Sequence, residues 1–186
     1  MRVLGIDPGS ETTGWGVVEG DGDGRKYRLI EFGTVKLSTS ATFASRLLKI
    51  SRGLEEVITR LKPDACAIEE AFHATNPKVT LKLGQVRGVV LLAAESAALE
   101  IAEYSPRRVK QTVAGYGNAE KRQVQEMVRV LLSLVSVPEP HDAADALAVA
   151  ICHFHHAGLS QRLLAAEARI KPGATGAAAT RRRVIR

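Results

Sequence analysis

Apolar residues along the chain recur with two periods, one typical of strands and one typical of helices. Short apolar or alternating runs predict strands at residues 2–7, 14–19, 27–37, 64–69 and 101–104. Apolar residues three or four positions apart predict helices at about 47–61, 77–99, 118–132, 141–156 and 159–169. In the strand at 27–37 the alternation changes parity near Gly33, which predicts a β-bulge there. Asn118 is the expected N-cap of the helix at 118–132.

The order of these elements predicts an α/β domain with a five-stranded mixed sheet flanked by helices. Its first strands would be antiparallel, with a hairpin loop at residues 21–24. Because the helix at 77–99 is apolar on more than one side, it is expected to pack against both the sheet and a partner subunit. We expect one domain over 1–157, a short helical extension over 158–170, and a disordered basic tail over 171–186.

Four carboxylates stand at the ends of predicted elements. Asp7 ends the first strand and Glu69 ends the fourth, whereas Asp142 and Asp145 lie three apart on one face at a helix start. Taken singly, each could be a turn or helix-start residue. Together they would repel one another unless a cation were bound, and oxygen ligands favour Mg²⁺ or Mn²⁺. Metal-assisted phosphodiester cleavage is therefore the first hypothesis.

The net charge of +6 is unevenly distributed over the 186 residues. Residues 171–186 hold five Lys and Arg and no acid, so the rest of the chain is nearly neutral. A local basic patch is predicted within 105–129 by Arg107, Arg108, Lys110, Lys121, Arg122 and Arg129. Such a patch would attract a phosphate-bearing partner, although each lysine taken alone would be an ordinary surface residue.

The other reactive side chains predict no disulfide and no second metal site. Cys66 and Cys152 lie in apolar surroundings, as buried free thiols of a reducing compartment do. The group of His153, His155 and His156 is expected at a helix end, where the helix dipole favours it. No signal peptide and no apolar segment of membrane-spanning length is visible, so a cytoplasmic protein is expected.

Six motifs occur in series over residues 1–156. They are Gly5-Ile6-Asp7-Pro8-Gly9-Ser10 with Thr13-Gly14, Ala67-Ile68-Glu69-Glu70-Ala71-Phe72, Leu81-Lys82-Leu83-Gly84-Gln85-Val86-Arg87-Gly88, Val109-Lys110-Gln111-Thr112-Val113, Gly117-Asn118-Ala119-Glu120-Lys121 and Asp142-Ala143-Ala144-Asp145-Ala146-Leu147-Ala148. In this order and at these spacings they resemble the RuvC family of Holliday junction resolvases.

The resemblance implies a ribonuclease H-like fold and a homodimer. The activity that it implies is that of a crossover junction endodeoxyribonuclease. Such an enzyme makes paired nicks in a four-way DNA junction during recombination and repair, leaving 5′-phosphate and 3′-hydroxyl ends. The implied partners are the junction itself and the branch-migration proteins RuvA and RuvB.

The resemblance also implies roles for single residues. The implied catalytic metal ligands, for about two Mg²⁺ per subunit with Mn²⁺ able to substitute, are Asp7, Glu69, Asp142 and Asp145. Since some family members carry His in place of the third carboxylate, His141 is a possible participant, as is Glu70 beside the aligned acid.

DNA contacts are implied for a basic pair and an aromatic residue. The pair corresponds to Lys110 and Lys121, and neighbouring Arg107 and Arg108 extend it. The aromatic that contacts bases near the crossover corresponds to Phe72, which could wedge into an opened base step.

Two other classes of protein remain possible from the sequence. The segment from Gly5 to Gly14 also resembles the first phosphate loop of actin-like ATPases and sugar kinases, but those enzymes need a second related domain. A junction-binding protein without catalysis would keep the basic patch and lack a complete carboxylate set.

Overall fold

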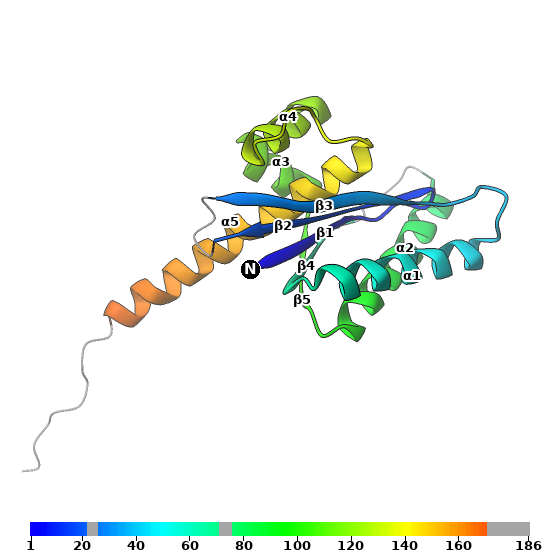
Figure 1. Ribbon diagram of the computed structural model, residues 1–186, viewed down its shortest axis with the longest axis horizontal. Helices are drawn as coiled ribbons and strands as arrows, with labels where there is room; N and C mark the ends of the chain where they lie inside the picture. Colours follow the sequence, from blue (N-terminus) through cyan, green and yellow to red (C-terminus); the bar gives the residue numbers. More distant parts are fainter. Residues whose placement is uncertain (22–25, 71–75, 171–186) are drawn as a thin grey trace, which may run out of the picture.

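The computed structural model describes residues 1–21, 26–70 and 76–170, with side chains up to residue 158. Within this part, five strands form one sheet in the order β3-β2-β1-β4-β5 (Figure 1). The strands are β1 (Arg2–Asp7), β2 (Thr12–Gly20), β3 (Tyr27–Lys36), β4 (Ala65–Glu69) and β5 (Glu100–Tyr104). The helices are α1 (Phe43–Leu61), α2 (Pro77–Ser96), α3 (Pro106–Ala114), α4 (Lys121–Leu131) and α5 (His141–Ile170). The predicted mixed α/β sheet is confirmed.

The sheet combines both kinds of strand pairing. β2 pairs antiparallel with β1 and β3, whereas β1 pairs parallel with β4, and β4 with β5. The carboxyl ends of β1, β4 and β5 therefore meet at one edge of the sheet. Loops at such an edge, outside the ends of parallel strands, are common places for functional residues.

The predicted bulge is real but lies elsewhere. Val17 pairs with Glu31 and Val18 with Leu29, so Ile30 is the extra residue. Gly33 pairs regularly with Trp15, and a Cβ there would lie 2.9 Å from a ring carbon of that tryptophan. The prediction at Gly33 was wrong because this glycine makes room for an indole and does not mark the bulge.

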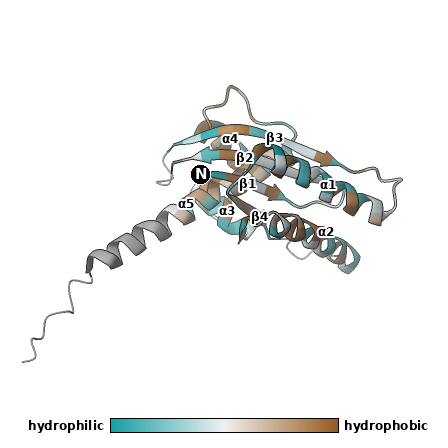
Figure 2. Ribbon diagram, turned by 60° about the horizontal axis from the view of Figure 1, so that its bottom comes forward, coloured by the Kyte–Doolittle hydropathy of each residue, from teal (hydrophilic) through white to brown (hydrophobic). Residues whose placement is uncertain are grey.

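Helices cover both faces of the sheet and enclose two hydrophobic cores. α1 and α2 pack on one face, and α3, α4 and α5 on the other (Figure 1). α1 buries a single apolar face, because Ile50, Leu54, Val57 and Leu61 recur at helical spacing. Figure 2 shows hydrophobic residues along α2 as well, and part of that surface is exposed.

Two helices differ from the prediction at their starts. α3 was not predicted, although Ser105 caps it and Pro106 is its first residue, a typical start signal. α4 starts at Lys121, not at Asn118. Glu120 is its N-cap residue, and the backbone N–H of Glu120 donates to Gln123 Oε1 at 2.8 Å.

The last helix is longer than predicted. α5 runs without interruption through both segments that were expected to be separate helices. The histidine group therefore lies within α5 and not at a helix end, so that prediction was wrong. His153 is buried and its Nδ1 lies 3.0 Å from the Tyr104 hydroxyl. The division at residue 157 stays a prediction.

Other expectations agree with the structure or fall outside it. Cys66 and Cys152 are free and buried, as predicted. No helix in the described ranges has both the length and the apolar character needed to cross a membrane. The predicted hairpin loop, beyond its first residue, and the tail at 171–186 lie outside the described residues.

Candidate active site

The parallel pairing of β1 and β4 brings two acids together. Ile6 is in register with Ile68, so the residues that follow, Asp7 and Glu69, are neighbours at the sheet edge. Their carboxyl groups lie close enough that each acts on the pKa of the other. The expected meeting of the first and fourth strand ends is therefore realised in the fold.

Two glycines let α5 approach the sheet closely. A Cβ added to Gly14 would lie 2.0 Å from the carbonyl oxygen of Asp142, and one added to Gly5 would lie 2.0 Å from that of Ala146. Only residues without a side chain fit under this helix backbone. Because Gly14 pairs with Asp7 across the sheet, this close contact holds the start of α5 beside the end of β1.

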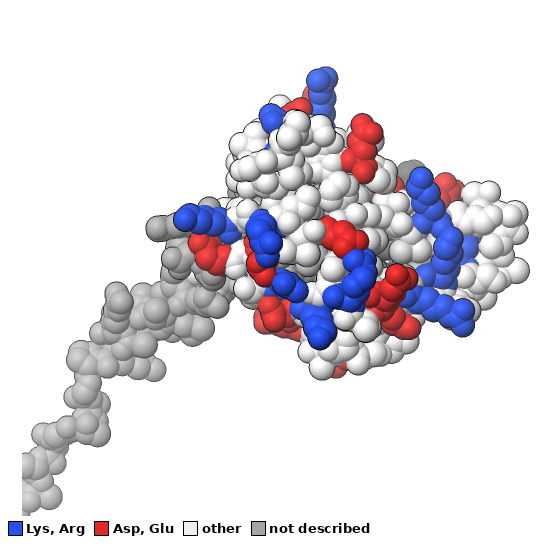
Figure 3. Space-filling view, viewed as in Figure 1, with Lys and Arg blue, Asp and Glu red and all other residues white. Residues whose placement is uncertain are grey.

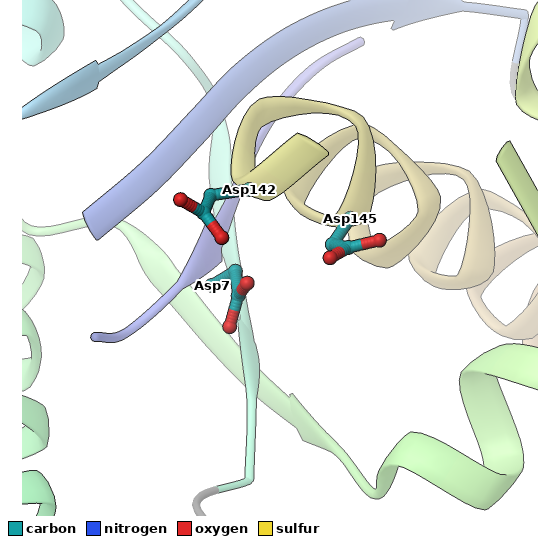
Figure 4. A group of neighbouring side chains, drawn as sticks. All are labelled: Asp7, Asp142 and Asp145. Carbon is teal, nitrogen blue, oxygen red and sulfur yellow. The ribbon is translucent and has the colours of Figure 1, made fainter. Parts of the chain in front are cut away.

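Three carboxylates converge at this point. Oxygens of Asp7, Asp142 and Asp145 all lie within 4.8 Å of one another. Figure 4 shows Asp142 and Asp145 projecting from the start of α5 on the side where Asp7 rises from the end of β1. Three oxygen donors at this separation, each partly exposed, fit a hard divalent cation such as Mg²⁺ or Mn²⁺.

Partial burial and mutual repulsion disfavour the charged forms of Asp7 and Glu69. Burial, followed by the charges of Asp145 and Asp142, raises the pKa of Asp7 to about 6. Burial and then the charges of Asp7 and Asp145 raise the pKa of Glu69 to about 8. A bound cation reverses this effect, since it favours the charged forms.

Two lysines face the acids across a small cavity. The cavity has a volume of about 160 Å³ and is lined by Glu69, Pro106, Val109, Lys110, Lys121, Val124, Asp145 and Ala148. Lys121 Nζ lies 2.5 Å from Asp145 Oδ2. Its partial burial lowers the pKa of Lys121, but the hydrogen bond and the charge of Asp145 outweigh this and raise it.

The remaining predicted residues lie around this centre or outside the described chain. Arg107 and Arg108 are exposed on α3 and do not line the small cavity. His141 and Glu70 are exposed beside the acids, but neither belongs to the group of three oxygens. Phe72 lies outside the described residues.

A larger cavity lies on the opposite side of the sheet. It measures about 660 Å³ between β3 and α1, and its lining includes Trp15, Lys49, Arg52 and Glu56. Its charged lining is mainly basic, with Lys36, Lys49, Arg52 and Arg60 against the acid Glu56. Figure 3 shows Lys and Arg side chains grouped side by side on the right of the visible face. None of the three converging acids lines this cavity, so size alone does not mark the reactive site.

The site geometry agrees with the comparisons to known proteins. The family model described as crossover junction endodeoxyribonuclease RuvC matches residues 3–153. The chain belongs to the RuvC family. A relative of that name from Chloroflexus aggregans is 52% identical over 162 residues, which is 87% of this chain and 98% of the relative.

Solved structures of RuvC and of a more distant resolvase share the fold of this chain. RuvC from Thermus thermophilus, solved in complex with a Holliday junction substrate, is 39% identical with a TM-score of 0.81, covering 86% of this chain and 96% of that one. The yeast mitochondrial Holliday junction resolvase Ydc2 shares the fold at 15% identity, with a TM-score of 0.62 over 89% of this chain and 85% of that one. The ribonuclease H-like fold implied by the motifs is therefore confirmed.

Membership of the RuvC family decides between this family and the two other classes of protein that the sequence left possible. The segment from Gly5 to Gly14 is part of the RuvC match and not of an actin-like kinase. The family is one of endodeoxyribonucleases, which separates the chain from junction-binding proteins without catalysis.

Proposed function

We propose that this protein resolves Holliday junctions by paired, symmetric, metal-dependent nicks in homologous recombination and DNA repair. The observation that carries the proposal is the convergence of Asp7, Asp142 and Asp145 in a RuvC-family chain. The related Thermus thermophilus protein was solved with a Holliday junction substrate. The products are nicked duplexes with 5′-phosphate and 3′-hydroxyl ends.

The four carboxylates hold the metal in this proposal. Asp7, Asp142 and Asp145 supply converging oxygens, and Glu69 joins them through its contact with Asp7. Four negative charges balance two Mg²⁺ or Mn²⁺ ions per subunit. When bound, the ions activate the attacking water and stabilise charge on the leaving oxygen.

Basic and aromatic residues position the DNA in this proposal. Lys110 and Lys121 line the cavity beside the acids and bind the phosphate backbone near the scissile bond. Arg107 and Arg108 extend this contact along α3. Phe72 follows the acid-bearing strand in sequence and inserts at an opened base step.

We further propose that two copies associate through α2. Leu81 is 67% and Leu92 64% exposed, a large apolar area on one side of the helix. Gly84 and Gly88 are exposed on the same side, and a Cβ added to either would meet nothing within 4 Å. A two-fold dimer through this stripe would present two matched sites to a four-way junction, which has two-fold symmetry itself.

Sedimentation tests the dimer. Leu81→Glu with Leu92→Glu should convert the protein to monomer at micromolar concentration, because four charges would be buried at the two-fold interface. Leu48→Glu is the matched control, since Leu48 is 51% exposed on α1. A wild-type protein that is monomeric both alone and with the junction would contradict this part of the proposal.

The partners implied by the family complete the proposal. RuvA and RuvB would deliver the junction by branch migration, and the protein would act in the cytoplasm on chromosomal DNA. A pull-down with purified RuvA and RuvB on a four-way junction tests the association directly.

A nicking assay tests the central proposal. The wild-type protein should cut a labelled four-way junction in the presence of Mg²⁺ and not with EDTA. Asp7→Asn should reduce cleavage to background while junction binding is retained, because the change removes a metal ligand and keeps the shape of the side chain. Glu56→Gln, an equally small change at an exposed position of α1, is the control, and this variant should cut the junction at the wild-type rate. An uncut junction at ample Mg²⁺ with wild-type protein would end the proposal.

A further inference from the structure

Lys121 forms an ion pair with Asp145, one of the acids that the proposed function assigns to metal. It is the first residue of α4, and its ammonium lies 2.5 Å from Asp145 Oδ2. The Lys121 side chain is 57% exposed and that of Asp145 20%. The charges of Asp142 and Asp7 also act on this ammonium. Lys121 is thus the cation that the fold itself supplies to the acidic group.

The Lys121 ammonium and a divalent ion cannot both contact Asp145 without strong electrostatic repulsion. Mg²⁺ needs its oxygen ligands at about 2.0–2.1 Å in near-octahedral geometry. An ion bound to Asp145 would lie within a few ångströms of the Lys121 ammonium, where two positive charges repel strongly. The exposed Lys121 stem can move outward, whereas Asp145 is held by the packing of α5 on the sheet.

We propose that Lys121 is a displaceable counter-ion of Asp145, which an entering metal ion replaces. The inference rests on the proposed metal-dependent function and adds to it. Lys121 weakens metal binding by competition. The same displacement releases its ammonium toward the cavity, where the phosphate of a bound strand would receive it. Metal occupancy and phosphate contact are thereby linked through one side chain.

Lys110 provides a matched comparison within the same cavity. It lines the cavity together with Lys121 and has the same charge and stem. Among the described residues, however, it forms no ion pair with a carboxylate. If Lys121 acted only through its general positive charge, removal of either lysine would change metal affinity alike.

The test measures Mn²⁺ binding to the full chain without DNA, by the loss of the free-ion electron paramagnetic resonance signal. Lys121→Met should bind Mn²⁺ about three- to tenfold more tightly than wild type, because the competing charge is gone. Lys121→Arg keeps the ion pair and should bind like wild type. Lys110→Met should stay within about twofold of wild type, since its charge is not paired with a ligand. Melting curves in EDTA check folding, and Lys121→Gln replaces the methionine variant if that one fails to fold.

The possible outcomes distinguish the counter-ion role of Lys121 from the metal-dependent function. Tighter binding by Lys121→Met alone supports the counter-ion role, and a purely structural role would weaken binding instead. Equal or weaker Mn²⁺ binding by folded Lys121→Met or Lys121→Gln overturns the inference and leaves the metal-dependent function intact. A wild-type protein that binds no Mn²⁺ overturns the proposed function, and this inference with it.

Discussion

The two faces of the sheet are packed by different means. On the α1 face, fully buried Leu4, Ile50 and Leu54 fill the space between helix and strands with large side chains. On the α5 face, glycines of β1 and β2 meet α5 along a run of alanines, so backbones nearly touch. The first arrangement separates helix and strands by large side chains, whereas the second brings a helix start within reach of a strand end.

The α1 face mainly stabilises the fold, whereas the α5 face positions the acids of the candidate site. Large side chains on the α1 face contribute hydrophobic burial but place no reactive group. Small residues on the α5 face contribute less burial each and fix Asp142 and Asp145 near Asp7. We therefore expect substitutions on the two faces to have separable effects.

The largest expected effects come from one substitution on each face of the sheet, one acting on cleavage and the other on stability. Gly14→Ala places a methyl group against the carbonyl oxygen of Asp142 and should push the start of α5 away from Asp7. The cleavage rate of the folded protein should fall by about 100-fold, since a displacement of about 1 Å has this effect in enzymes. Leu54→Ala should instead lower the free energy of unfolding by about 2–5 kcal/mol and leave cleavage by the folded fraction unchanged.

The measurement pairs denaturant melts with nicking rates at a temperature where both variants are folded. Equal losses of cleavage in the two variants would show that the faces are not functionally distinct.

A second effect should be confined to the α5 face, because the acids with raised pKa lie there. Between the ordinary carboxyl pKa and the raised values of about 6 and about 8, the folded protein holds protons that the unfolded chain releases. The protonation of these two acids therefore stabilises the folded state at low pH. This contribution to the free energy of unfolding is lost as pH rises through about 6 for Asp7 and about 8 for Glu69. Metal binding needs the charged forms, so Mg²⁺ affinity should rise from about pH 6 to about pH 8, by up to about tenfold per pH unit for each proton displaced.

Calorimetric Mg²⁺ titrations across this range would measure the slope. Glu69→Gln should flatten it, because the acid with the higher pKa is removed. An affinity that does not vary with pH in the wild type would mean that these acids do not take part in binding.

The smallest effect concerns DNA contacts. Lys110→Ala, beside the acids, should reduce the salt slope of junction binding by about one, as expected for the loss of one phosphate contact. Lys121→Ala should act alike when metal is bound. Lys49→Ala, on α1 at the opposite face, should leave the slope unchanged. A change for Lys49 equal to that for Lys110 would show that DNA contacts both faces.

The sequence predicted the acids of the site better than the helices around it. Asp7 and Glu69 follow continuous apolar runs. β4 runs parallel to β1 because the helix α1 connects β4 to β3, which itself runs parallel to β1. Asp142 and Asp145 share a face because of local helix geometry alone. These predictions depended on short-range patterns, which one sequence contains.

Features that depend on packing were missed. α3 buries only Val109 and Val113, too few positions for a periodic signal, so only its Ser105-Pro106 start could have revealed it. The pairing of Lys121 with Asp145 depends on how α4 packs against α5, and nothing in either segment specifies the other.

The order of the elements along the chain has a consequence for synthesis. β1 leaves the ribosome first with Asp7, but two of the three converging oxygens belong to α5, the last helix of the described chain. A nascent polypeptide therefore lacks the complete proposed cleavage centre until α5 has emerged and docked on the glycines of β1 and β2. If these acids cut DNA as proposed, the topology delays that ability until the domain is finished, without the need for an inhibitor.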